Sequence, residues 1–109
     1  MNESDRIKKL KAIADLMRER DLAKLSRAQA AKARTEDLLR ALDRSSAPFL
    51  PETTIAAQVH EKYGLWSANR RIALNQQHAR ETATWLSNRE VAQRSFGQSE
   101  VLTRLLERK

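Results

Sequence analysis

The sequence predicts an all-α fold in which two long helices form one antiparallel coiled-coil hairpin over residues 1–109. The chain contains only two glycines and two prolines, so few positions interrupt a helix. Both prolines, Pro48 and Pro51, lie near the middle, where they end one helix and allow the next to begin. Charged residues make up 32% of the composition and cysteine is absent. This profile is typical of long helices in a reducing compartment.

The first predicted helix spans residues 4–44. Asn2 or Ser4 can cap its free amides, and Glu3 and Asp5 suit the positive end of the helix dipole. Apolar or small residues recur at steps of three and four, the pattern of a helix that packs along its length. They are Ile7, Leu10, Ala14, Met17, Leu25, Ala28, Ala31, Leu38 and Leu42.

A bend over residues 45–51 leads into the second predicted helix, over residues 52–109. Its seam begins at Ile55 and Val59. A second apolar line recurs every eleven residues, a spacing that keeps side chains nearly in register on a straight helix. One seam cannot easily bury both lines, so either the seam drifts onto the second line or its members contact a partner. These candidate partner-binding residues are Tyr63, Leu74, Trp85 and Phe96.

Folding at the bend is predicted to pair residues whose numbers add up to about 97. Leu42 would then face Ile55, and Leu38 would face Val59. In this register the start of the first helix lies opposite Phe96, so residues 99–109 overhang the hairpin. The overhang carries an apolar stripe without a partner in the chain, and such stripes usually mark interfaces. Its candidate partner-binding residues are Val101, Leu102, Leu105 and Leu106.

The residue types that perform chemistry do not form an enzymatic or metal-binding pattern. His60 and His78 are the only histidines, and eighteen residues of helix separate them by about 27 Å. Gly64 and Gly97 are isolated, so no phosphate-binding loop is predicted. We therefore expect no catalytic residue, no cofactor and no metal site. No apolar run approaches the length of a membrane span, and we expect a cytoplasmic protein.

The formal net charge is +7, which leaves two interpretations open. Twelve Lys and Arg accompany eight Asp and Glu up to Arg44, and nine accompany five from Thr53 onward. Interspersed charge of this kind favours solvated flanks of a coiled coil. A basic hairpin that binds nucleic acid or an acidic protein is the alternative. Self-association through the apolar stripes is a further possibility.

Four sequence segments carry a resemblance to a known family. They are Ile7-x-x-Leu10-x-x-Ile13, the run Asp21-Leu22-Ala23-Lys24-Leu25-Ser26-Arg27-Ala28, the pattern Trp66…Ile72-Ala73-Leu74…Trp85…Arg89, and the end Leu102-x-x-Leu105-Leu106-x-Arg108. With them the chain resembles the FliJ family of flagellar export proteins and the related stalk proteins of type III secretion. The resemblance implies a non-catalytic hairpin whose paired termini enter the ring of an export ATPase. It also implies contact with the export gate, and hence a place at the inner-membrane export apparatus of a bacterium.

Overall fold

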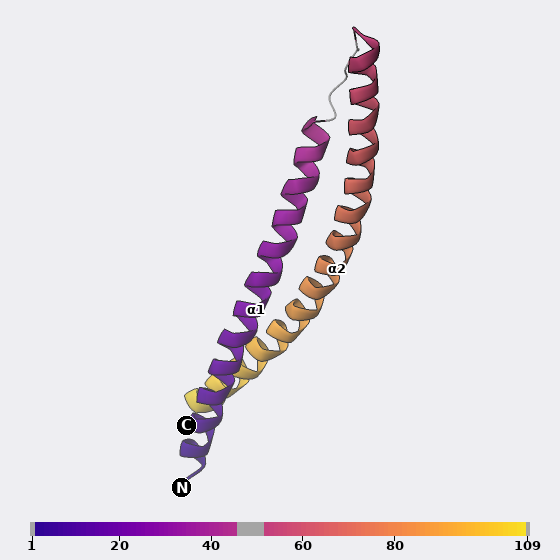
Figure 1. The fold of residues 1–109 in the computed structure, drawn as a ribbon. Coiled ribbons are helices and arrows are strands. Elements are labelled where there is room, and N and C mark those ends of the chain that lie inside the picture. Colours follow the sequence, from indigo (N-terminus) through magenta and orange to yellow (C-terminus); the bar gives the residue numbers. More distant parts are fainter. Residues whose placement is uncertain (1, 46–51, 109) are drawn as a thin grey trace. The chain divides into compact units, whose positions relative to one another are not determined.

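A computed structural model describes residues 2–45 and 52–108 of the chain, and Figure 1 shows its fold. The described residues form two helices, α1 (Glu3–Ser45) and α2 (Thr54–Glu107), and no strand. The helices pack against each other in opposite directions, so the predicted all-α antiparallel hairpin is confirmed. Apart from Ser45, which ends α1, the predicted bend lies outside the described residues.

Short polar side chains begin both helices. The Asn2 Oδ1 atom accepts a hydrogen bond of 2.8 Å from the Asp5 amide, so Asn2 is the cap of α1. The Thr53 Oγ1 atom accepts one of 3.0 Å from the Ala56 amide and caps α2 in the same way. Since Thr53 is the cap, α2 begins two residues later than the sequence predicted.

The contacts of the chain divide it into two compact units. The terminal unit consists of Met1–Ala30 and Ala83–Lys109, and the central unit consists of Ala31–Thr82. In each unit one segment of α1 packs against one segment of α2. The terminal unit therefore holds the start of α1 together with the end of α2.

The seam between the helices is built mainly from small and polar side chains. Every seventh residue of α1 from Ile7 to Leu42 is buried, as expected for a helix that packs along one stripe. These residues are Ile7, Ala14, Asp21, Ala28, Thr35 and Leu42. The buried residues of α2 are Ser67, Leu74, Ala92, Ser95 and Ser99. Because most of these side chains are short, each unit buries little apolar surface, which is the main stabilising term in folding.

The register of the two helices differs from the predicted one. Five interhelical pairs have residue numbers that add up to 114–116, not about 97. They are Asp15 with Ser99, Asp21 with Ser95, Thr35 with Glu81, Glu36 with His78, and Asp43 with Arg71. A shift of about eighteen residues is five turns of helix. Both registers therefore present the same faces, and apolar periodicity alone does not distinguish them.

The corrected register moves the unpaired end of the hairpin. Ser99 is buried against α1, so residues 99–109 do not overhang, and that prediction was wrong. In the central unit, α2 instead begins well beyond the end of α1 (Figure 1). Ile55 is 74% exposed, whereas its predicted partner Leu42 is buried. The predicted pairs of Leu42 with Ile55 and of Leu38 with Val59 are therefore wrong.

Candidate protein-binding groove

An open apolar groove of about 690 Å³ lies between α1 and α2 in the terminal unit. Residues at helical spacing supply one wall from each helix, because positions three and four apart share a face. The wall from α1 consists of Leu10, Ile13, Ala14 and Met17, and the wall from α2 consists of Arg94, Gly97, Gln98, Val101 and Leu102. This arrangement suits an apolar segment lying along the two helices.

Gly97 leaves part of the groove unfilled. A Cβ atom added to this residue would have no neighbour within 4 Å. The backbone there is ordinary helix, since no glycine among the described residues has a positive φ. Glycine inside a helix costs about 1 kcal/mol relative to alanine. The absence of a side chain at this position therefore widens the groove at the expense of helix stability.

A polar cluster joins the two helices beside the groove. The Ser99 hydroxyl donates a hydrogen bond of 2.6 Å to Asp15, and the Lys11 ammonium lies 2.7 Å from the same carboxylate. The Lys11 contact, with help from Ser99, lowers the pKa of Asp15 below its ordinary value of 3.8. The cluster fixes the start of α1 against the end of α2.

A second polar pair lies deeper in the terminal seam. Asp21 is only 2% exposed, and its carboxylate accepts hydrogen bonds from the Ser95 hydroxyl and from the Arg20 guanidinium. The Ser95 hydrogen bond is the main reason that the pKa of Asp21 lies below 3.8. The predicted sum of about 97 would place Asp21 near Gln76, Gln77 and Arg80, whereas in the observed register its partner on α2 is Ser95. Because a buried carboxylate needs a partner, this pair favours one register over its alternatives.

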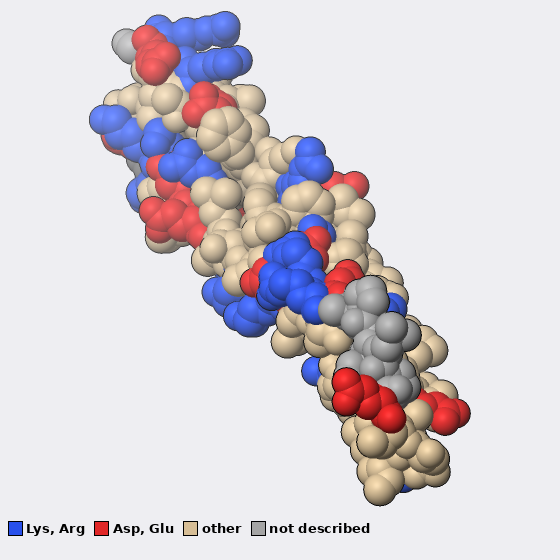
Figure 2. All heavy atoms as spheres, turned by 90° about the horizontal axis from the view of Figure 1, so that it is seen from above, with Lys and Arg blue, Asp and Glu red and all other residues tan. Residues whose placement is uncertain are grey.

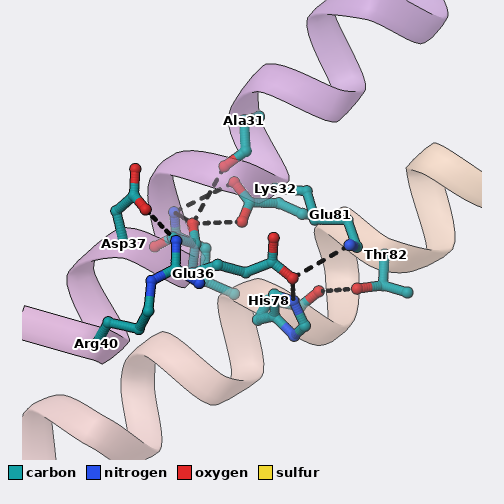
Figure 3. Close-up of polar contacts among 10 residues, drawn as sticks. Ala31, Lys32, Glu36, Asp37, Arg40, His78, Glu81 and Thr82 are labelled. Atoms are coloured by element: carbon teal, nitrogen blue, oxygen red, sulfur yellow. Dashed lines mark hydrogen bonds and ion pairs between the residues drawn. The ribbon is translucent and has the colours of Figure 1, made fainter. Parts of the chain in front are cut away.

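The central unit contains its own polar network (Figure 3). Thr35 donates a hydrogen bond to Glu81 and accepts one of 3.2 Å from the Gln77 amide. Next to it, Glu36 of α1 lies 3.1 Å from the His78 ring and 3.2 Å from Lys32. The His78 contact lowers the pKa of Glu36 below its ordinary value of 4.5. The network joins α1 to α2.

The stripe predicted at the end of α2 lies beside the groove instead of on an overhang. Val101 and Leu102 line the groove, and Val101 is 56% exposed while Leu102 is half-buried. Leu105 is 38% exposed and Leu106 is half-buried. The stripe thus faces partly toward α1 and partly toward solvent. Any partner that contacts Val101 and Leu102 in the groove would also contact the α1 wall.

The four residues at intervals of eleven have different environments. Leu74 is 1% exposed and belongs to the seam of the central unit, so its side chain is not available to a partner. Tyr63 and Phe96 are exposed, and the Tyr63 hydroxyl donates a hydrogen bond to Ser45. Trp85 is half-buried under the Arg89 guanidinium, at 5.6 Å from its ring centre. The seam therefore drifts onto this line at Leu74, one of the two outcomes that the sequence allowed.

Sequence reasoning missed the contribution of α1 to the groove. Leu10 and Met17 were assigned to the seam, and Ile13 was noted only as part of the resemblance. Leu10 and Ile13 are more than half exposed, and Ala14 takes the buried place between them. The sequence did contain a signal for this arrangement. Ile7, Ala14 and Asp21 are spaced seven residues apart and so form one buried stripe, and Leu10 and Met17 lie outside that stripe.

Charged side chains of both signs are mixed on the surface. On the face drawn in Figure 2, Lys and Arg side chains alternate with Asp and Glu, without one continuous basic stripe. Within residues 2–45 and 52–108, no group of three or more His, Asp or Glu side chains is placed to hold a metal ion. In the same residues, neither helix is apolar enough over a sufficient length to cross a bilayer.

Comparison with known proteins gives no relative for this chain. No protein-family model, no curated protein and no solved structure matches it.

The three lowered pKa values predict that the hairpin loses stability in acid. Folding favours the ionised forms of Asp15, Asp21 and Glu36, so the unfolded chain binds more protons near pH 4. These three carboxylates contribute fully to the free energy of unfolding at pH values above their ordinary pKa values of 3.8 and 4.5. The contribution is lost as the pH falls through the lower pKa values of the folded chain. Thermal unfolding followed by circular dichroism should show Tm falling as the pH is lowered through the acid range. Asp21→Asn should reduce this fall, whereas Asp37→Asn, at an exposed position, should not.

Proposed function

We propose that this chain is a non-catalytic adaptor that binds a protein partner through its terminal unit. The observation that carries the proposal is the distribution of large apolar side chains. The seam buries mainly alanine, serine and threonine, so large apolar side chains are exposed in both units, Ile55 and Leu65 of the central unit among them. In the terminal unit, Leu10, Ile13 and Val101 are more than half exposed and line one groove. Exposed apolar surface gathered in one place usually marks an interface. A partner that covers the groove adds apolar burial that the chain alone lacks.

The partner that we propose is the ring of a flagellar or type III export ATPase, and the role is that of a stalk that assists export. Two points support this choice. The sequence resembles stalk proteins in which the paired ends of the two helices enter such a ring, and the terminal unit pairs the first turns of α1 with the last turns of α2. The location that follows is the cytoplasm beside the export apparatus.

The test is the ATPase rate of a purified flagellar export ATPase with and without this chain. We expect the chain to raise the rate, and Ile13→Asp with Val101→Asp to abolish the increase, because two carboxylates in an apolar groove oppose burial. Leu65→Asp is the matched control, since Leu65 is 64% exposed in the central unit. Point substitutions are preferable to deletion of residues 99–109, which would remove the buried Ser99. No effect of the unaltered chain on binding or rate would reject this partner.

A further inference from the structure

The walls and the rim of the groove differ in chemistry. The walls are apolar apart from Arg94 and Gln98. Arg6 and Lys9 lie one helical turn before Leu10 and Ile13, so they stand at the rim on the α1 side. Arg94 lines the groove from α2. Among the described residues, none of these three cations forms an ion pair. They are therefore free to pair with charges on a bound molecule.

The charge of the whole terminal unit has the same sign. Its described residues carry twelve Lys and Arg against eight Asp and Glu. The acidic residues of this part of α2 are Glu90, one turn before Arg94, and Glu100, between Gln98 and Val101. A second copy of the chain would bring the same positive excess to the groove, and like charges oppose such pairing. The charge favours an acidic occupant over a second copy.

The shape of the groove specifies the occupant further. It runs between two antiparallel helices, along two turns of each, from Leu10 to Met17 and from Arg94 to Leu102. A third helix laid there completes a three-helix bundle and buries apolar residues spaced three and four apart. Gly97 lets such a helix approach α2 closely, because no side chain stands in its way.

We infer that the terminal groove binds an amphipathic helix of a partner protein, with an apolar stripe that enters beside Gly97 and acidic flanks that pair with Arg6, Lys9 and Arg94. This inference gives the chemistry of the partner element at the surface used by the proposed function, and it rests on that function for its biological setting. It does not depend on which protein supplies the helix.

Three fluorescent peptides test the inference by anisotropy with the full chain. Each is a designed helix: one has a leucine stripe and glutamate flanks, one has the same stripe and lysine flanks, and one has the glutamates with the stripe scrambled. We expect the first to bind at least about tenfold more tightly than the other two in low salt. Its advantage over the lysine peptide should shrink as salt is added, because exposed charge pairs are screened. Equal binding of the glutamate and lysine peptides would overturn the inference.

Two glycine substitutions provide a matched pair. Gly97→Leu places a side chain in the groove, while Gly64→Leu places one in open space on the same helix in the central unit. Both replace glycine by a better helix former, so neither should unfold the chain, and circular dichroism verifies this. Gly97→Leu should weaken binding of the glutamate peptide about tenfold or more, and Gly64→Leu should leave it unchanged. Equal effects of the two substitutions would contradict the assignment of the groove.

Other occupants give different results in the same assay. A DNA duplex that displaces the peptide equally from the unaltered chain and from Arg94→Glu would show a diffuse polyanion surface and overturn the inference. Sedimentation that shows a dimer dispersed by Gly97→Leu would assign the groove to a second copy and also overturn it. Peptide binding without any effect on an export ATPase would reject only the proposed partner. If Gly97→Leu still stimulates the ATPase, the groove is not the partner-binding site, and the proposed partner stands.

Discussion

Leu74→Ala should lower the free energy of unfolding by about 2–5 kcal/mol. Leu74 is the largest fully buried side chain of the described residues, at 1% exposure. It shares its surroundings with Leu38 and Leu42 of α1, and the small residues elsewhere in the seam cannot fill the space that its removal leaves. Since single domains are stable by about 5–15 kcal/mol, the loss removes a large share of the total.

Urea and thermal unfolding followed by circular dichroism measure the effect of Leu74→Ala. The matched control is Leu65→Ala, which makes the same substitution on the same helix at a position that is 64% exposed. The control should change the free energy of unfolding by less than about 0.5 kcal/mol. Equal effects of the two substitutions would mean that Leu74 does not lie in a packed seam.

Ser99→Leu should destabilise the terminal unit by about 1–3 kcal/mol through overpacking. Ser99 is 1% exposed and donates a hydrogen bond to Asp15 across the seam. The larger side chain does not fit between the helices, and the substitution also removes the donor to a carboxylate. The effect should appear as earlier unfolding and faster amide hydrogen exchange in the first turns of α1.

Ser87→Leu is the control for Ser99→Leu, because it makes the same change on an exposed face of α2 in the same unit. Leucine is a better helix former than serine, so this variant should be as stable as the unaltered chain or slightly more stable. If Ser99→Leu were equally harmless, the end of α2 would not be packed against α1.

Elements of the fold were predictable because their signals are local. Two prolines in the middle, few glycines and a heptad spacing indicate two long helices without reference to any tertiary contact. Caps were partly predictable, since both Asn2 and Ser4 fit the start of α1 and only the hydrogen bond to Asp5 decides between them. The class of the fold followed from these features, and the structure confirms it.

Register was not predictable by the same means. A shift of five helical turns preserves every apolar face, so the pairing of apolar residues by a sum of about 97 was self-consistent but wrong. The polar contacts of Asp15 and Asp21 with Ser99 and Ser95 distinguish the two registers, and serine on a helix gives no signal of its partner. The groove depends on the register, because it brings Ile13 together with residues of α2. Its α2 wall was therefore predicted in part, and its α1 wall was not.

Chemical cross-linking of cysteine pairs tests the register most directly, since the chain has no cysteine of its own. A short bismaleimide should link Asp15→Cys to Ser99→Cys in the terminal unit and Asp43→Cys to Arg71→Cys in the central unit, because both pairs are in contact. Thr54→Cys lies seventeen residues from Arg71, or about 25 Å along the helix, and should react with Asp43→Cys far more slowly. Faster linkage of Asp43→Cys to Thr54→Cys than to Arg71→Cys would contradict the register. If Asp15→Cys did not link to Ser99→Cys, the two helices would not pack in the terminal unit as described, and the groove between them would not exist.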